Sequence, residues 1–486
     1  MTSSHSPRDL PLCVDLDGTL LRTDSLHELC VGLLSKHPLD VLKLPGWLMR
    51  GGRAHLKARL TERVTLSASR LPYRTEVVDE VRASAAAGRS TLLVTAADQA
   101  VANEIAAHVG AFSEVLGSDG TQNLKGARKA TLLAERFGRG GFEYIGDSAA
   151  DLPVWEAAEG ALLAAPSARL KMRVAARVPV RAIFGTPASV AERLGSWFRE
   201  LRLHQWVKNL LLLLPLAASH QLLDGHLVGL ATLAFACFCL VSSGVYVLND
   251  LVDLDSDRGH PTKRLRPFAS GALPLWSGVL VGPALAAAAF ALAAFALPLA
   301  FSVVLGVYVL ANGAYSLGLK RIAVADVVLL AGLYVLRVIA GGVAVGVELS
   351  PWLLAFCLFF FLNLAFLKRY QELRQIAGSA ETVAAGRGYR AADLDLLRSL
   401  GPSAGYLAVS VLVFYIQSQT VIELYGRPWV LWLVAPLAIF WITRIWLFAH
   451  RGEMDDDPVL FAIRDRTTWG VAVCGGLLGF VAAAPL

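Results

Sequence analysis

The pattern of apolar and polar positions divides the chain into two parts. Before about residue 200, short apolar runs end in polar residues, as in LPLCV (10–14), TLLV (91–94) and FEYIG (142–146). Strands of this length, interleaved with longer helical stretches, predict an α/β domain with an open, Rossmann-like sheet. From residue 206 onward, long apolar runs alternate with short charged connections, which predicts an all-α membrane domain.

Nine apolar runs approach the length of about 17–25 residues that a membrane span needs. They lie near 209–223, 227–248, 275–296, 298–318, 323–346, 350–368, 404–424, 428–449 and 468–485. If the chain starts in the cytoplasm, the connections expected inside are rich in Lys and Arg, whereas those expected outside carry only Arg427. By the positive-inside rule, this asymmetry predicts that the N-terminal domain and the charged connections face the cytoplasm.

Composition and charge narrow the class of protein. Charged residues make up 17% of the 486 residues, and 55% are hydrophobic; soluble domains carry about 25% charged residues. The N-terminal MTSSHSPRDL lacks the apolar core of a signal peptide, and the six cysteines show no zinc spacing. We therefore expect an integral protein of the inner or cytoplasmic membrane, in contact with the bilayer and without a nucleic-acid partner. The sequence leaves its oligomeric state open.

We expect three segments along the chain. Residues 1–160 would form the α/β domain, with a helical cap at about 24–88, and residues 205–486 would form the membrane domain. Between them, residues 161–204 would be a basic linker followed by an interfacial helix, because apolar positions in 187–204 recur at helical spacing. The linker's cations would attract anionic headgroups; they are Arg169, Lys171, Arg173, Arg177 and Arg181.

The most informative segment is NDLVDLDSDRGHPTKRLRP (249–267), which follows the second apolar run. On a helix, Asp250, Asp253 and Asp257 fall on one face, about 60° wide, while Asp255 points away and would be solvated. Three carboxylates on one face repel each other unless a cation lies between them. Mg²⁺ prefers oxygen ligands and often binds substrate phosphates as well. The segment therefore predicts a Mg²⁺–diphosphate site, in which Asn249 would bind a substrate oxygen.

The same residues resemble those of a known family. N-D-x-x-D-x-x-x-D followed by R-P-x-x-x-G (266–271) is similar to the UbiA superfamily of intramembrane prenyltransferases, which implies nine helices around a cavity and aspartates that hold Mg²⁺ on a diphosphate. One branch, the decaprenyl-phosphate phosphoribosyltransferases, is more similar. Its motifs match here as QWVKN (205–209), DRGHPTKRLRP (257–267), YSLGLK (315–320), LRVIAGG (336–342) and LKRYQEL (367–373).

This branch implies 5-phosphoribosyl 1-diphosphate as the donor and a polyprenyl (decaprenyl) phosphate as the acceptor. This donor is highly anionic, so its site needs cations in addition to magnesium. Arg and Lys both bind phosphate. Asp250 and Asp253 would be catalytic through the metal. The candidate substrate-binding residues are Lys208, Asn209, Asn249, Lys263, Arg264, Arg266, Tyr315, Lys320, Arg337, Lys368, Arg369 and Tyr370. For Arg337, a structural ion pair is an equally good interpretation; for Lys320, a snorkelling anchor is.

The chain also departs from the aromatic prenyltransferases of the superfamily. Those carry a second aspartate-rich motif after the sixth span, where this chain reads LKRYQELRQ with Glu372 as its single acid. That departure favours the phosphoribosyl branch. The role of residues 455–466 stays open.

Polar residues follow three of the short apolar runs in the N-terminal domain. D-x-D-G-T (15–19), Thr95 and GDSAAD (146–151) come in the order of the haloacid dehalogenase (HAD) superfamily, which this part resembles. The family's lysine would be Lys129, with Lys125 as the alternative. Strand ends of this kind meet at one edge of an open sheet, where ligands bind.

The HAD resemblance implies a phosphatase. Asp15 would attack phosphorus, and Asp17 would protonate the leaving oxygen and then activate water. Thr95 and the lysine would hold phosphoryl oxygens. Asp15, Asp147 and the carbonyl group of Asp17 would bind Mg²⁺, and Asp151 would order that site.

Together, the two halves predict a bifunctional enzyme with Mg²⁺ in both domains. The membrane half would transfer 5-phosphoribose to a polyprenyl phosphate, and the HAD half would remove the 5-phosphate for cell-wall biosynthesis. The alternative enzyme is an aromatic prenyltransferase with a separate or regulatory HAD domain. A transporter with a regulatory HAD domain ranks third, because no internal repeat is visible.

Overall fold

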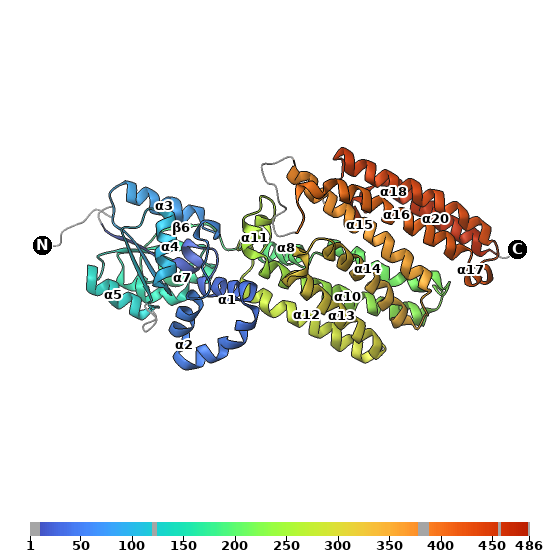
Figure 1. The fold of residues 1–486 in the computed structure, drawn as a ribbon. Helices are drawn as coiled ribbons and strands as arrows, with labels where there is room; N and C mark the ends of the chain where they lie inside the picture. The colour runs from blue at the N-terminus through green and yellow to red at the C-terminus, as the bar shows by residue number, and fades with distance from the viewer. Residues whose placement is uncertain (1–9, 119–123, 378–387, 455–457, 485–486) are drawn as a thin grey trace. The chain divides into compact units, whose positions relative to one another are not determined.

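The computed structural model describes residues 10–118, 124–377, 388–454 and 458–484 (Figure 1). Residues 455–457, at the start of the segment whose role the sequence left open, lie outside the described residues. Contacts divide the chain into two compact units, residues 1–203 with 246–283 and residues 204–245 with 284–486.

The first unit contains a six-stranded parallel sheet with the order β3-β2-β1-β4-β5-β6. The strands are β1 (Leu12–Val14), β2 (Thr91–Asp98), β3 (Glu114–Ser118), β4 (Glu143–Gly146), β5 (Gly160–Ala164) and β6 (Val180–Phe184). Val14 and Cys13, neighbours in β1, belong to two different apolar cores. The sheet is therefore covered on both faces, as its nearly continuous apolar strands require. The expected α/β domain is confirmed.

Helices fill the connections between these strands. They are α1 (Ser25–Lys36), α2 (Leu44–Thr61), α3 (Thr75–Ala86), α4 (Gln99–Val109), α5 (Ala127–Phe137), α6 (Leu152–Ala157) and α7 (Ala168–Ala175). The first three lie in the stretch where we expected a helical cap. Lys57 of α2 donates a hydrogen bond to the Ala96 carbonyl group of β2 at 2.5 Å, so α2 reaches the strand backbone next to Thr95.

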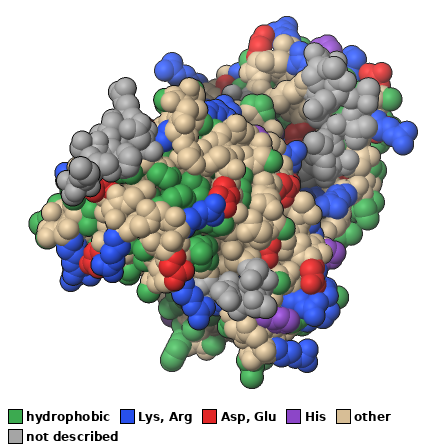
Figure 2. Space-filling model, turned by 90° about the vertical axis from the view of Figure 1, so that its left-hand side faces the viewer, with side chains coloured by type: hydrophobic (Ala, Val, Ile, Leu, Met, Phe, Trp, Pro, Cys, Tyr) green, Lys and Arg blue, Asp and Glu red, His purple; other side chains and the backbone are tan. Residues whose placement is uncertain are grey.

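The expected basic linker is wrong over its first half. Residues 160–184 form β5, α7 and β6 and complete the sheet. The many cations of this stretch made it look like a solvent-exposed linker in the sequence. In the structure two of them pair with acids: Arg177 pairs with Glu156, and Arg181 pairs with Glu143 and Glu159. The face of the molecule in Figure 2 likewise has cationic and acidic side chains interspersed.

A helix does form in the predicted interfacial segment, α8 (Val190–Glu200), which begins with a capping box between Ser189 and Glu192. Its apolar residues Val190, Leu194 and Phe198 are exposed and lie one turn apart. Contact with a bilayer surface stays a prediction for this helix.

The described part of the chain has eight helices long and apolar enough to cross a membrane. They are α10 (Gly225–Val252), α12 (Leu275–Ala296), α13 (Leu299–Leu317), α14 (Ala325–Val345), α15 (Pro351–Ala377), α16 (Leu394–Ile416), α18 (Val434–Arg451) and α20 (Arg466–Ala483). The count of nine is not confirmed. The first predicted span divides into a 3₁₀ helix (Leu203–Leu213) and α9 (Leu214–Ala218), where Pro215 cannot donate a backbone hydrogen bond.

Within the first unit, helix α1 of the α/β domain contacts α11 (Leu254–Arg258), a short helix inside the aspartate segment. The Arg258 guanidinium donates two hydrogen bonds to Glu28, at 2.8 and 2.7 Å, and a third to the Ala269 carbonyl group. Both side chains of the pair are nearly inaccessible, 6% and 2% exposed. An exposed pair, Arg70 with Asp255, lies nearby, with 47% and 63% exposure.

We expect Glu28→Ala to destabilise the first unit by about 3–5 kcal/mol, because it leaves the buried Arg258 charge without its acid. Arg70→Ala removes the exposed pair and should cost less than about 1 kcal/mol. Thermal unfolding midpoints of the full chain in detergent compare the two variants. Equal shifts would contradict the buried pair's structural role.

Candidate active sites

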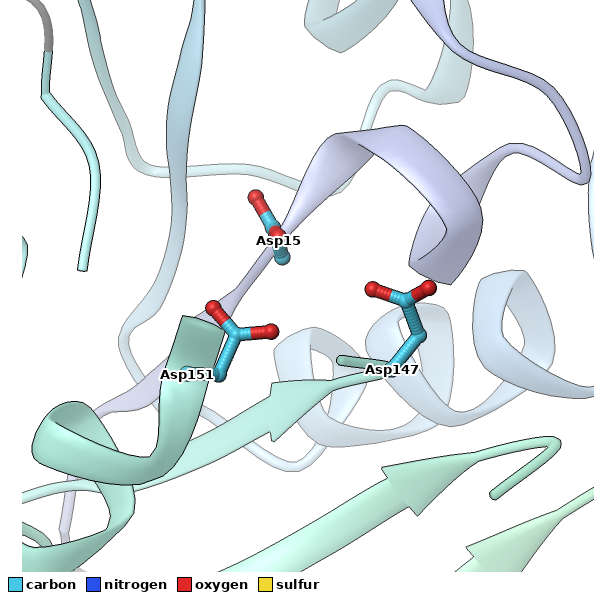
Figure 3. A group of neighbouring side chains, drawn as sticks. All are labelled: Asp15, Asp147 and Asp151. Carbon is cyan, nitrogen blue, oxygen red and sulfur yellow. The ribbon is translucent and has the colours of Figure 1, made fainter. Parts of the chain in front are cut away.

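Three carboxylates meet at the carboxyl edge of the sheet (Figure 3). Asp15 follows β1, Asp147 follows β4, and Asp151 lies in the short helix Ala149–Asp151. Each offers an oxygen within 4.8 Å of the others. Because β1 and β4 are parallel neighbours, their last residues reach the same edge of the sheet.

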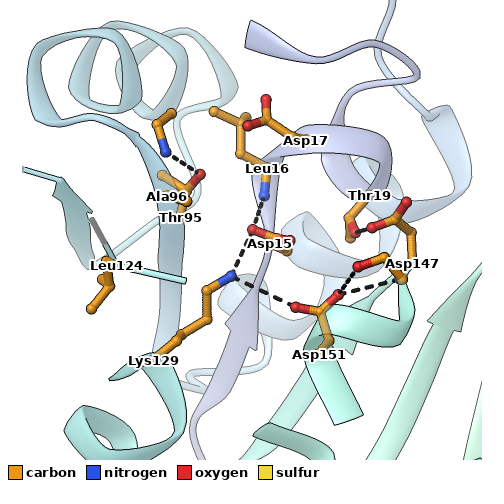
Figure 4. Close-up of polar contacts among 12 residues, drawn as sticks. Asp15, Leu16, Asp17, Thr19, Thr95, Ala96, Leu124, Lys129, Asp147 and Asp151 are labelled. Atoms are coloured by element: carbon orange, nitrogen blue, oxygen red, sulfur yellow. Dashed lines mark hydrogen bonds and ion pairs between the residues drawn. The ribbon is translucent and has the colours of Figure 1, made fainter. Parts of the chain in front are cut away.

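Lys129 of α5 reaches into this group (Figure 4). Its Nζ lies 2.8 Å from Asp15 Oδ1 and 2.7 Å from the Tyr144 hydroxyl group, which donates to Asp151 Oδ1 at 3.1 Å. Lys129 is buried, whereas Lys125 is exposed. This geometry favours Lys129 as the phosphatase lysine. Sequence reasoning missed Tyr144, whose place in an apolar strand gave no signal of a polar role.

Asp17 and Thr95 occupy separate positions around the three carboxylates. The Asp17 carboxylate accepts hydrogen bonds from the Ser25 backbone N–H at 2.7 Å and from its hydroxyl group at 3.2 Å, so the start of α1 orients it. Its side chain is not part of the three-carboxylate group among the described residues. The Thr95 hydroxyl group, buried within β2, accepts a hydrogen bond from the Ala97 backbone N–H at 3.0 Å.

The site has the donor set that Mg²⁺ prefers. Burial, and then the neighbouring Asp15 charge, raise the pKa of Asp147 to about 8. Burial also raises the pKa of Asp15, against the effect of Lys129. A cation bound between these carboxylates would offset the repulsion between their buried negative charges. Gly18 has φ +75°, and a Cβ there would lie 2.2 Å from Asp147 Oδ2, so glycine is required beside the site.

The pKa of Asp17 predicts a pH dependence. Burial, and next the charge of Asp24, raise this pKa to about 7. A general acid must be protonated, so kcat/KM for a small phosphomonoester should fall as pH rises through about 7. Asp24→Asn keeps the N-cap of α1 but removes the charge, and should move this limb to lower pH. An unshifted limb would argue against Asp17 as its source.

The aspartate segment of the first unit forms a second carboxylate group. Arg266 Nη1 lies 3.1 Å from Asp250 Oδ1 and 2.5 Å from Asp257 Oδ2, so these two aspartates share one face. Arg202 also pairs with Asp250. Both carboxylates are buried, and burial raises the pKa of Asp257 to about 6 despite Arg266.

Asp253 lies between α10 and α11, and the helical hydrogen-bond pattern between residues four apart continues across it. Its backbone N–H donates to Asn249 O at 2.8 Å, and the Asp257 N–H donates to Asp253 O at 2.8 Å. The three aspartates thus follow one another at roughly one-turn intervals. Asp255 is exposed, while Asn249 and Asp253 are half-buried.

Two arginines and a glutamate lie beside Asp250, and sequence reasoning found one of the three. Of the predicted cations 263–266, Arg266 is brought to the aspartates, whereas Lys263 and Arg264 are exposed. Arg202 and Glu200 were not predicted as site residues. Their signal was present, since ELR (200–202) places charges directly before the first apolar run.

In the second unit, Arg337 lies in a buried polar cluster. Its Nε donates to Asn209 Oδ1 at 2.9 Å, and its Nη2 donates to the Tyr308 hydroxyl group at 2.8 Å. The guanidinium also lies over the rings of Tyr308 and Tyr334. Among the described residues Arg337 has no acidic partner, so the structural ion pair considered for it is not found.

Arg369 is the centre of another buried cluster in the second unit. It donates to Asp326 at 2.5 Å, to the Tyr315 hydroxyl group at 2.9 Å and to Glu372. The acid at the position of a second aspartate motif, Glu372, is thus bound to an arginine. Of the remaining predicted residues, Tyr370 contacts His450 Nδ1 at 3.2 Å, and the partly exposed ones are Lys208, Lys320 and Lys368.

Two family models match the chain. The UbiA prenyltransferase family matches residues 211–482, more than half of the chain, and the haloacid dehalogenase-like hydrolase family matches residues 12–156. With eight helices of spanning length in the described part of the chain, the first match makes this an integral membrane protein.

Three curated relatives extend these matches. The y4nM protein of Sinorhizobium fredii is 40% identical over 467 residues, covering 95% of this chain and 89% of that protein. Nodulation protein NoeC of Azorhizobium caulinodans is 35% identical, covering 58% of this chain and 90% of that protein. Decaprenyl-phosphate phosphoribosyltransferase of Mycolicibacterium smegmatis is 38% identical over 194 residues, covering 39% of this chain and 60% of that protein. The chain therefore belongs to the UbiA prenyltransferase family and carries an N-terminal HAD-like hydrolase domain.

Proposed function

We propose that the membrane domain transfers 5-phosphoribose from 5-phosphoribosyl 1-diphosphate to a polyprenyl phosphate, and that the HAD domain then removes the 5-phosphate. The observation that carries this proposal is the pairing of Asp250 and Asp257 with Arg266 and Arg202. Carboxylates for a divalent cation and guanidinium groups for phosphate stand together there. Both are needed for a small donor with several phosphates.

In the transfer step, a phosphate oxygen of the lipid would attack C1 of the ribose, and the bond from C1 to the diphosphate would break. Asp250, Asp253 and Asp257 would hold Mg²⁺, which offsets the charge of the leaving diphosphate when it is bound. Arg266 and Arg202 would bind phosphoryl oxygens. Arg337, buried and without an acid among the described residues, would bind another substrate phosphate.

In the hydrolytic step, Asp15 would attack the 5-phosphate, and Asp17 would protonate the departing ribose oxygen. Water, deprotonated by Asp17, would then cleave the aspartyl-phosphate and release inorganic phosphate. Lys129 would hold the nucleophile and a phosphoryl oxygen in place. The product would be polyprenyl-phosphoryl ribose, and both sites would face the cytoplasm.

The family also includes prenyltransferases, so transfer of a prenyl group is the second candidate function. One observation counts against it. Glu372, the acid where aromatic prenyltransferases would carry a second aspartate motif, is held by Arg369. LKRYQELRQ (367–375) offers no other acid there, so the second aspartate-rich motif is missing.

The test uses the purified full chain in detergent with Mg²⁺, phosphoribosyl diphosphate labelled in the ribose, and a polyprenyl phosphate. We expect labelled lipid that carries ribose without its 5-phosphate. A parallel reaction supplies polyprenyl diphosphate and an aromatic acceptor. Prenyl transfer there, with no labelled lipid in the first reaction, would replace the phosphoribosyl function with the second candidate.

A further inference from the structure

Glu200, the last residue of α8, is a buried acid without a visible role. It is 1% exposed, and neither carboxylate oxygen accepts a hydrogen bond from a donor among the described residues. An ionised carboxylate removed from water is costly unless it meets a cation or a donor. Glu200 therefore indicates a partner that is bound from solution, either a cation or a hydrogen-bond donor.

The neighbour of Glu200 is the Asp250 carboxylate. The two carboxyl groups lie close enough to share one proton, and Arg202 and Arg266 also act on Glu200. Both arginines donate to the same oxygen of Asp250, Oδ1. Two carboxylates side by side are stable when they share a proton or a metal ion.

The net charge of the side chains around Glu200 also favours a bound cation. Glu200, Asp250 and Asp257 supply three carboxylates, and Arg202 and Arg266 supply two guanidinium groups. With every group ionised, the cluster has one excess negative charge. A diphosphate would draw the arginines toward its own oxygens and increase the demand for positive charge at the acids.

We propose that Glu200 is an additional acidic ligand of the transferase cation site, binding the divalent cation, or one of its water ligands, together with Asp250 and Asp257. This inference rests on the proposed function, because it assumes that the aspartate segment holds a divalent cation. It adds a residue from α8, outside the aspartate segment that defines the site in sequence. Glu200 would partly replace the acids that the second motif position lacks.

The test measures Mn²⁺ binding directly, by the electron paramagnetic resonance signal of free Mn²⁺, on the full chain in detergent. All proteins carry Asp15→Asn and Asp147→Asn, so that the HAD site does not contribute. The variants added to this background are Glu200→Gln, Glu200→Ala and Asp250→Asn. Glu192→Gln is the matched control, because Glu192 is an exposed acid of the same helix.

We expect Glu200→Gln and Glu200→Ala to weaken Mn²⁺ binding about tenfold, with Glu192→Gln unchanged and Asp250→Asn without measurable binding. Unfolding midpoints without metal check that each variant is folded. Rescue of binding by glutamine, but not by alanine, would show that Glu200 only donates a hydrogen bond to Asp250, and would overturn the proposal.

The remaining outcomes separate the two levels of inference. Loss of binding in Asp250→Asn, with full affinity in both Glu200 variants, would reject Glu200 as a ligand and retain the cation site. Full affinity in Asp250→Asn would remove the cation site itself, and with it the proposed magnesium-dependent transfer.

Discussion

Asp15→Asn should yield a labelled lipid that keeps its 5-phosphate. Asparagine preserves the size of the side chain and can still accept from Leu16 N, as the Asp15 carboxylate does, but an amide oxygen cannot form the aspartyl-phosphate. Loss of a nucleophile lowers turnover by roughly 10³-fold or more. The transferase residues are untouched, so phosphoribosyl transfer should continue and its product should accumulate.

The measurement is the ratio of phosphorylated to dephosphorylated ribosyl lipid after a single incubation with labelled donor. Arg136→Ala is a suitable control, because it removes an exposed pair with Glu114 and should leave this ratio at the wild-type value. If the dephosphorylated lipid forms equally fast in Asp15→Asn, the HAD domain is not the phosphatase for this product.

Asp250→Asn should stop the transfer itself and leave the phosphatase intact. Asp250 faces both Arg202 and Arg266, so its change removes a cation ligand and leaves two partly buried guanidinium groups with less compensating charge. Removing one group that stabilises charge at a reaction centre costs on the order of 10²–10³-fold in rate. We expect incorporation of labelled ribose into lipid to fall by at least that factor.

Asp255→Asn is the matched control within the same segment, since Asp255 is exposed and pairs with Arg70. It should retain nearly all transfer. Hydrolysis of a small phosphomonoester, measured on the same preparations, should be equal in the wild type and both variants. A parallel fall in both activities of Asp250→Asn would indicate misfolding and not a lost ligand.

The α/β domain could be predicted in detail because its polar residues follow apolar strands at fixed points. A strand of three residues followed by D-x-D-G-T places Asp15 and Asp17 in known relation to the sheet edge. Residues 161–184 were misassigned as a linker for the opposite reason. Their strands are short, and their arginines resemble solvent-exposed charge until Glu143 and Glu159 are seen beside Arg181.

By itself, the sequence determined the two domain classes, the family of each and the aspartates of each candidate site. The domain classes and the aspartates follow from local spacing, since residues one helical turn apart, or at the end of a strand, are neighbours wherever the chain goes. The families follow from the motifs that these residues resemble. Only the tertiary structure decided that Lys129 and not Lys125 reaches Asp15, that Arg369 pairs with Asp326, and that Glu200 lies against Asp250. Each of these contacts joins segments tens of residues apart, and its formation depends on how helices and strands pack, which periodicity in one segment does not encode.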